Sequence, residues 1–130
     1  MDTKNVGLTW FRISVVYFSI AVILGVIMGA SGDHSLFPLH AHLNTLGWVS
    51  MALMGLIYRH FHEAGQNRLA KAHFWLYNLG LPVMMVTLAA KLKGYAQVEP
   101  ILGISSIVVA SGVVLFTLNL LLNARPQARS

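Results

Sequence analysis

The sequence predicts an all-α integral membrane protein built as a four-helix bundle. Of its 130 residues, 56% are hydrophobic and only 10% are charged, and the mean hydropathy is +0.66. A chain this apolar has too few charged side chains to cover the surface of a soluble domain. Its nine Lys and Arg residues stand singly beside apolar runs and form no basic patch, so nucleic acid is not an expected partner. The expected surroundings are the lipid bilayer.

Four apolar stretches each come near the ~20 residues that a helix needs to cross the hydrocarbon core. They comprise residues 9–30, 40–61, 72–90 and 101–123. The connecting segments are short and contain Gly, Pro or polar residues, which predicts that successive helices are antiparallel neighbours. Residues 1–130 are therefore expected to form a single membrane domain.

Small residues in the first and last stretches predict close helix packing. Gly25 and Gly29 stand four positions apart near the end of the first stretch, and Ser106 and Ala110 have the same spacing in the last one. Small side chains let helix backbones approach one another inside a membrane. We interpret both pairs as packing features.

The basic residues predict that both termini are cytoplasmic, and a bacterial inner membrane is the expected location. Seven of the nine Lys and Arg residues fall on one side of the predicted bundle, whereas Lys91 and Lys93 fall on the other. Cytoplasmic segments of membrane proteins carry such an excess of positive charge. This orientation divides the six histidines into an outer group, His34, His40 and His42, and an inner group, His60, His62 and His73.

The two histidines that open the second stretch cannot both face the bundle, because positions two apart on an α-helix are separated by about 200°. His40 shares a face with Asn44, so we expect His40 to point inward, the alternative being a plain interfacial helix cap. The face of His42 is mostly lipid-like, which favours a structural or partner-facing role for His42. The inward face continues through Gly47, Met51, Met54 and Tyr58, and the outward face through Thr45, Val49, Leu53 and Leu56.

The third stretch has a polar and small-residue face of its own. His73 begins this face and is interpreted as a packing and hydrogen-bonding residue at the inner end of the helix. His60 and His62 stand at the membrane edge and are expected to be solvated. The face that begins at His73 continues through Tyr77, Gly80, Met84 and Thr87.

The motif LHAHLNTLGWVSMALMGLIY (39–58), followed by LAKAHFWLYNLG (69–80), resembles the second and third helices of subunit I of the haem-copper oxidase superfamily. The cbb-type cytochrome oxidase and nitric oxide reductase branches are the most similar. The resemblance extends to LGVIMGA (24–30) and covers roughly residues 10–90. It implies that a histidine of the second helix is an axial ligand of haem b near the outer face. Counting back from Tyr58 matches that histidine to His40, with His42 as the alternative.

The resemblance does not imply an oxidase that acts alone. The later helices of a full subunit I carry the second axial histidine and the histidines of the catalytic metals, and the last apolar stretch of this chain contains no histidine. No catalytic residue is assigned. The expected function is haem b binding by a small membrane protein in electron transfer, gas sensing or support of a respiratory oxidase or nitric oxide reductase.

The second axial ligand is left open by the sequence. Met28, His34 and His42 are close to His40 in the sequence, and a histidine from a second copy would complete a bis-imidazole site, so a homo-oligomer or a respiratory complex is the expected assembly. Asn44 is expected to hydrogen-bond the His40 ring or a haem edge. Two alternatives remain: a cofactor-free interaction or assembly subunit, and a copper site that uses Met28 with the outer histidines, because thioether and imidazole suit copper.

Overall fold

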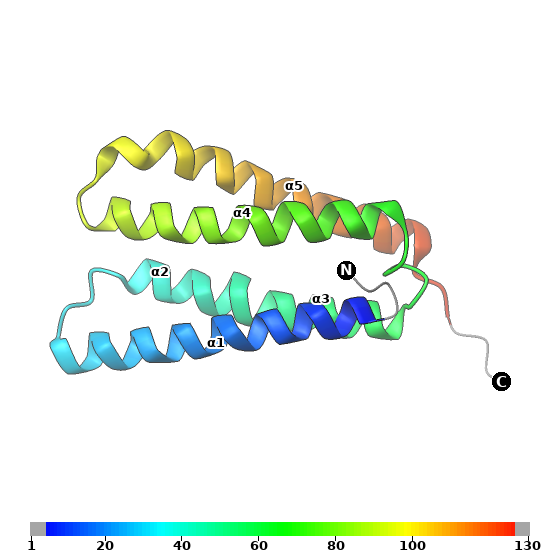
Figure 1. The fold of residues 1–130 in the computed structure, drawn as a ribbon, viewed down its shortest axis with the longest axis horizontal. Coiled ribbons are helices and arrows are strands. Elements are labelled where there is room, and N and C mark those ends of the chain that lie inside the picture. The colour runs from blue at the N-terminus through cyan, green and yellow to red at the C-terminus, as the bar shows by residue number, and fades with distance from the viewer. Residues whose placement is uncertain (1–4, 127–130) are drawn as a thin grey trace.

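The computed structural model describes residues 5–126, within which all regular secondary structure is helical. Four helical rods run antiparallel along the chain, as Figure 1 shows. The first rod is α1 (Val6–Ser31), and the second consists of α2 (Phe37–His42), η2 (Leu43–Ser50) and α3 (Met51–His60). The third rod is α4 (Arg68–Leu92), and a short turn, η3 (Ala96–Val98), leads into the fourth, α5 (Glu99–Asn123). The predicted all-α fold with four helices is confirmed.

Two helix ends are set by caps that hydropathy does not detect. The side chain of Asn67 accepts a hydrogen bond from the amide of Ala70 at 2.9 Å, so α4 begins before its apolar run. At the other end of α1, Gly32 adopts a left-handed conformation with φ 71°, and its amide donates to the carbonyl of Met28 at 3.0 Å. Both caps lie at the edges of the predicted spans.

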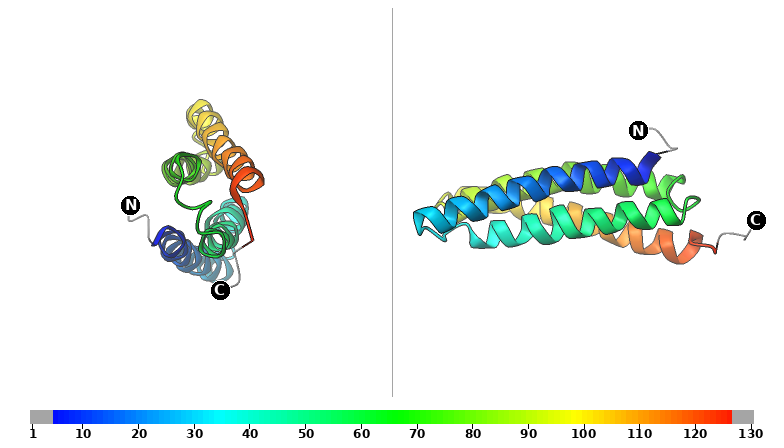
Figure 2. Two further views of the ribbon diagram at one scale, coloured as in Figure 1. Left: turned by 90° about the vertical axis from the view of Figure 1, so that its right-hand side faces the viewer. Right: turned by 90° about the horizontal axis from the view of Figure 1, so that it is seen from below.

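The rods form two hairpins, one of α1 with the second rod and one of α4 with α5. The two views in Figure 2 show these pairs stacked as two layers. In the first hairpin the backbones approach most closely at Gly7 and Gly55, where a Cβ atom added to Gly55 would lie 2.7 Å from the carbonyl oxygen of Gly7. In the second, Gly80 and Gly112 allow the approach of α4 and α5.

The predicted packing pairs are only partly correct. Gly25 does face a neighbouring helix, but Gly29 is exposed and a Cβ atom there would meet nothing within 4 Å. Ser106 is half-buried, whereas Ala110 is exposed. Spacing places two residues on one face of a helix, but it does not determine whether that face meets a neighbour.

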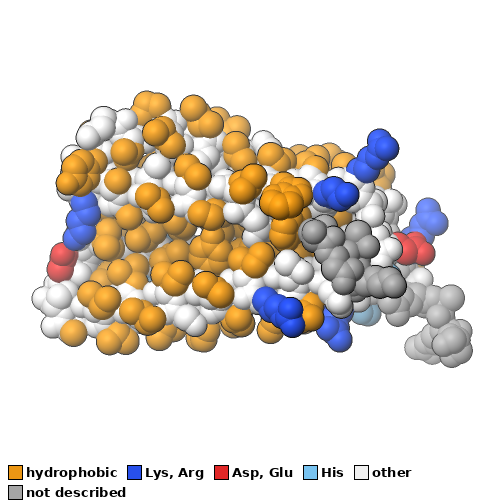
Figure 3. Space-filling model, viewed as in Figure 1, with side chains coloured by type: hydrophobic (Ala, Val, Ile, Leu, Met, Phe, Trp, Pro, Cys, Tyr) orange, Lys and Arg blue, Asp and Glu red, His pale blue; other side chains and the backbone are white. Residues whose placement is uncertain are grey.

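Within residues 5–126, three helices are long and apolar enough to cross a membrane: α1, α4 and the helical segment Ala96–Asn123. The second rod is helical from residue 37 to residue 60, but its hydrogen-bond pattern changes to that of a π-helix between Leu43 and Ser50. It is therefore not one long α-helix, and its predicted crossing stays a prediction. Apolar side chains cover much of the face of the molecule that Figure 3 shows.

The two ends of the bundle differ in charge. Figure 3 shows most of the visible Lys and Arg side chains at one end, which also holds the start of α1 and the end of α5. We call this the basic end, and we call the end formed by residues 32–36 and 93–98 the opposite end. The distribution agrees with the sequence pattern, while the assignment of the basic end to the cytoplasm stays a prediction.

A buried polar cluster joins the two hairpins near the basic end. His73 on α4 is fully buried, stacks on Trp10 of α1 with ring centroids 4.6 Å apart, and lies with Nδ1 2.8 Å from the hydroxyl of Tyr58 on α3. Asn119 on α5 is also fully buried and donates to the carbonyl of Ala64 at 2.7 Å. The cluster therefore connects all four rods, and His73 has the packing and hydrogen-bonding position that the sequence predicted.

Candidate functional site

His40 lies in the interface between α2 and α1. Its imidazole ring is half-buried and sits against Gly25, where a Cβ atom would approach Cε1 of the ring to 2.9 Å. Nδ1 of His40 lies 2.9 Å from the carbonyl oxygen of Ala21, on the same helix as Gly25. The absence of a side chain at Gly25 leaves room for the ring, and the hydrogen bond to the carbonyl of Ala21, one turn earlier on α1, fixes its orientation.

The hydrogen bond to Ala21 determines which ring nitrogen of His40 carries the proton and which carries the lone pair. A carbonyl oxygen only accepts, so Nδ1 must carry the proton and donate it, and in the neutral ring Nε2 then carries the lone pair. The side-chain amide of Asn44 lies 3.4 Å from Nε2 and donates to the carbonyl of His40 at 3.0 Å. Asn44 is therefore next to the ring, as predicted, and its amide contacts the lone pair of Nε2, so a metal ion bound at Nε2 would replace this contact.

The other two outer histidines make the same type of hydrogen bond. Nδ1 of His42 donates to the carbonyl of Pro38 at 2.7 Å, and Nδ1 of His34 donates to the carbonyl of Gly32 at 3.0 Å. His42 is half-buried and His34 is exposed. The predicted outward face of His42 is confirmed for its other members, Thr45, Val49, Leu53 and Leu56, which are all exposed.

The predicted site residues do not converge on one point within the chain. Among the described residues, no three His, Cys, Asp or Glu side chains lie close enough together to hold a metal ion, and this includes His34, His40 and His42. Met28 is buried in α1 with 5% of its surface exposed. The structure thus presents His40 as a single positioned imidazole.

The π-helical segment η2 begins directly after the histidine pair. Such wide turns are rare and are often found at functional sites. The hydroxyl of Thr45 donates to the carbonyl of Ala41 at 2.8 Å, and the hydroxyl of Tyr77, which comes from α4, donates to the carbonyl of Leu46 at 2.8 Å. The segment is thereby connected to the second hairpin, and sequence spacing alone did not predict it.

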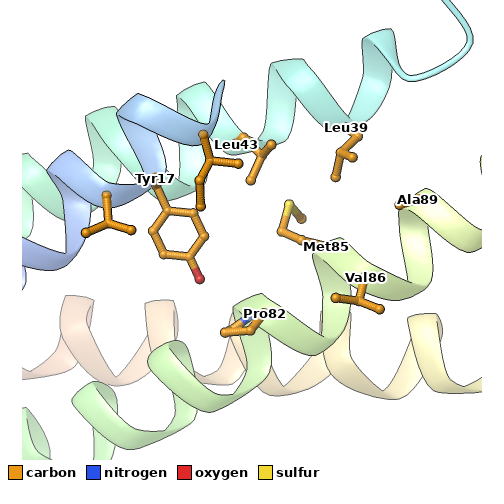
Figure 4. Close-up of a pocket in the computed structure, with 9 residues that line it drawn as sticks. Tyr17, Leu39, Leu43, Pro82, Met85, Val86 and Ala89 are labelled. Atoms are coloured by element: carbon orange, nitrogen blue, oxygen red, sulfur yellow. The ribbon is translucent and has the colours of Figure 1, made fainter. Parts of the chain in front are cut away.

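His40 faces a neighbouring helix, as expected, but it does not line the groove between the two hairpins. An apolar groove of about 440 Å³ lies between α1, the second rod and α4, and it is lined by Leu39 and Leu43 but by neither His40 nor His42 (Figure 4). His40 instead faces α1 at Ala21 and Gly25. The phase argument identified the more enclosed face of the helix but could not determine which neighbour that face meets.

A polar contact at the opposite end links the two hairpins. Asp33 accepts a hydrogen bond from the amide of Ser35 at 2.9 Å, and its other carboxylate oxygen lies 3.2 Å from Nζ of Lys93. The hydrogen bonds from Ser35, followed by the interaction with Lys93, lower the pKa of Asp33 to about 2. Asp33 is therefore ionised at neutral pH, and its ion pair with Lys93 connects the two exposed loops.

Sequence reasoning missed several residues that shape these sites. Gly25 was interpreted as a helix-packing residue, although its position serves the His40 ring. Trp10 and Asn119 were not singled out, although both are fully buried in the polar cluster. An Asn within an apolar stretch is a usable signal, because a polar side chain at membrane depth needs a partner.

No protein-family model matches the chain, and searches of curated proteins and of solved structures find no match. The resemblance to subunit I of the haem-copper oxidases therefore depends on the motifs of the sequence alone.

Proposed function

We propose that this chain is an integral membrane protein that binds haem b through Nε2 of His40. One observation carries the proposal: the Nδ1–H group of His40 donates to the carbonyl of Ala21 at 2.9 Å. Histidines that bind metal typically donate their second ring nitrogen to a carbonyl or carboxylate, which fixes the ring and raises its basicity. The resemblance of residues 39–58 to the haem-binding helix of the oxidase subunit points to the same residue.

The surroundings of His40 suit an apolar macrocycle. The ring is half-buried between α1 and α2, and the exposed side chains that flank Gly25 along α1 include Val22 and Val26, which would keep water from a porphyrin edge. Asn44 can donate to an acceptor beside the ring. The carbonyl of Ala21 would orient the imidazole and the apolar surroundings would tune the reduction potential, while the bound haem would supply one-electron chemistry or an open iron position.

The number of protein ligands on the haem iron would distinguish electron transfer from gas binding. A second imidazole, from another copy or from a respiratory partner, would give a bis-imidazole haem suited to electron transfer. An open sixth position would suit binding of a diatomic gas. Both options use His40 in the same way, so the first experiment concerns this residue.

The test is to purify the protein in mild detergent and to measure haem per chain from the reduced pyridine adduct. We expect a Soret band in the wild type, its loss in His40→Ala, and its retention in His42→Ala and His73→Gln. Retention of the Soret band in His40→Ala together with its loss in His42→Ala would show that His42, and not His40, binds the haem. A colourless wild type, after growth with added haem precursor, would contradict haem binding and favour a cofactor-free subunit or, if metal analysis finds copper, a copper site.

A further inference from the structure

We propose that the groove between α1, the second rod and α4 binds the head of a membrane-soluble quinone. This inference is independent of haem binding at His40, because the groove is lined by other residues. Its nine lining residues are Val16, Tyr17 and Ile20 from α1, Leu39 and Leu43 from the second rod, and Pro82, Met85, Val86 and Ala89 from α4. The volume of about 440 Å³ is in the range of small-molecule sites, about 300–1,000 Å³.

The two hairpins contact each other through polar groups on both sides of the groove. On the side of the basic end, the Tyr77 hydroxyl binds the carbonyl of Leu46. At the opposite end, Lys93 contacts Asp33. The groove lies between these two contacts, and Figure 3 shows a hollow surrounded by apolar side chains on this face. A ligand that enters from the lipid would therefore meet walls from both hairpins.

Tyr17 supplies the feature that separates this groove from an ordinary lipid-facing depression. Figure 4 shows its ring projecting into the groove, with the hydroxyl directed towards α4. Within the part of the chain that the structure describes, this hydroxyl makes no hydrogen bond. The ring is positioned by Gly47, where a Cβ atom would lie 2.7 Å from the Tyr17 ring. A half-buried hydroxyl that is fixed in position and has no hydrogen-bond partner favours a ligand that carries a hydrogen-bond acceptor.

Pro82 lines the groove and interrupts the hydrogen-bond pattern of α4. Proline has no N–H group, so the carbonyl of Asn78, four residues earlier on α4, has no amide donor at the usual helical position. Asn78 is not among the lining residues, so the groove combines an apolar wall with one polar group, the hydroxyl of Tyr17. A quinone ring presents a carbonyl oxygen that can accept a hydrogen bond from this hydroxyl.

The depth of Tyr17 distinguishes a quinone from a phospholipid. Tyr17 lies near the middle of α1, whose 26 residues span about 39 Å at 1.5 Å per residue. The polar groups of a phospholipid stay near the membrane surface, whereas the ring of a long-chain quinone can enter the hydrocarbon core. A hydrogen-bonding group at this depth therefore suits a quinone ring and not a lipid headgroup.

The experiment uses methionine methyl groups as reporters. The protein is labelled with [methyl-13C]methionine in detergent and titrated with decylubiquinone, with decylbenzene as a probe that has the same tail and a ring without oxygen. Met85 lines the groove, whereas Met54 is buried in α3 away from it. We expect a saturable shift of the Met85 signal with decylubiquinone, no shift at Met54, and at least tenfold weaker binding of decylbenzene.

Two variants and one control complete the test. Tyr17→Phe keeps the ring and removes one hydrogen bond, so we expect about five-fold weaker binding. Ala89→Phe fills the groove and should abolish the shift, while Tyr95→Phe removes an exposed hydroxyl elsewhere and should have no effect. Equal binding of both probes, or unchanged binding in Tyr17→Phe, would overturn the proposal and leave the groove as a surface that ordinary lipid chains cover.

Discussion

The hydroxyl of Tyr58 lies 2.8 Å from Nδ1 of His73, and this contact joins α3 of one hairpin to α4 of the other. Both side chains are fully buried. Asn119 approaches the same hydroxyl to 3.5 Å with its amide nitrogen. Since the amide donates, the hydroxyl of Tyr58 is free to donate to His73, and Nε2 of His73 then carries the ring proton.

Tyr58→Phe should therefore loosen the attachment between the hairpins. The change leaves Nδ1 of His73 without its donor, and Nε2 of His73 already has no partner among the described residues. We expect a loss of about 1–3 kcal/mol in the free energy of unfolding, measured in detergent by circular dichroism. A double-mutant cycle with His73→Phe should show coupling between the two positions. Additive effects would show that the hydrogen bond contributes nothing measurable.

Gly55→Ala should destabilise the first hairpin. The new Cβ atom would lie 2.7 Å from the carbonyl oxygen of Gly7 and 3.1 Å from the amide nitrogen of Phe11, and these backbone atoms cannot move without separating the helices. We expect a loss of at least about 1–3 kcal/mol. Gly29→Ala is the matched control, because its Cβ atom would meet nothing within 4 Å. The control should be neutral or slightly stabilising, since Ala favours helix more than Gly does.

Gly25→Ala should weaken haem binding while keeping the fold. The added methyl group would come within 2.9 Å of Cε1 of His40, so the ring must shift and its hydrogen bond to Ala21 must lengthen. Loss of such a supporting bond typically weakens metal binding about 10–100-fold. Haem titration of the apoprotein, compared with the Gly29→Ala control, measures this effect. Unchanged affinity in Gly25→Ala would show that the position of the His40 ring does not control the site.

The contribution of Asp33 to stability should disappear in acid. Its pKa in the folded protein, about 2, lies below the ordinary value of 3.8, so its contacts with Ser35 and Lys93 stabilise the fold above about pH 4. This contribution falls as the pH drops from about 4 to about 2, where the carboxylate takes up a proton. Melting temperatures of wild type and Asp33→Asn should differ at pH 6 and converge near pH 2. A constant difference across this range would mean that ionisation of Asp33 is irrelevant.

The topology can be measured with reporter fusions in cells. A reporter placed after Ser31 or Gly94 should indicate the outer side, and one placed after Gly65 the cytoplasm, because most Lys and Arg residues lie at the basic end. An outer signal at Gly65 would reverse the orientation. It would also move His40 to the cytoplasmic half of the membrane.

The sequence by itself determined the helical rods and the character of their faces. Length and apolarity locate the rods, and within the second rod a period near 3.6 residues separates the buried face of Met51 and Tyr58 from the exposed face of Val49 and Leu53. These features are local, since they depend only on residues within one helix. The sequence also favoured His40 over His42 as the more enclosed site residue, and the haem assignment itself awaits the experiments above.

Only the tertiary structure decided which faces meet. The partners of the His40 ring are a backbone carbonyl at Ala21 and the empty space at Gly25, and neither is encoded by a side chain that a motif could reveal. The π-helical turn of η2, the groove beside Tyr17 and the cluster of Trp10 with Asn119 likewise depend on how far each rod rotates and where it crosses its neighbours. Rotation and crossing are fixed by the joint packing of all four rods, so no single stretch of sequence specifies them.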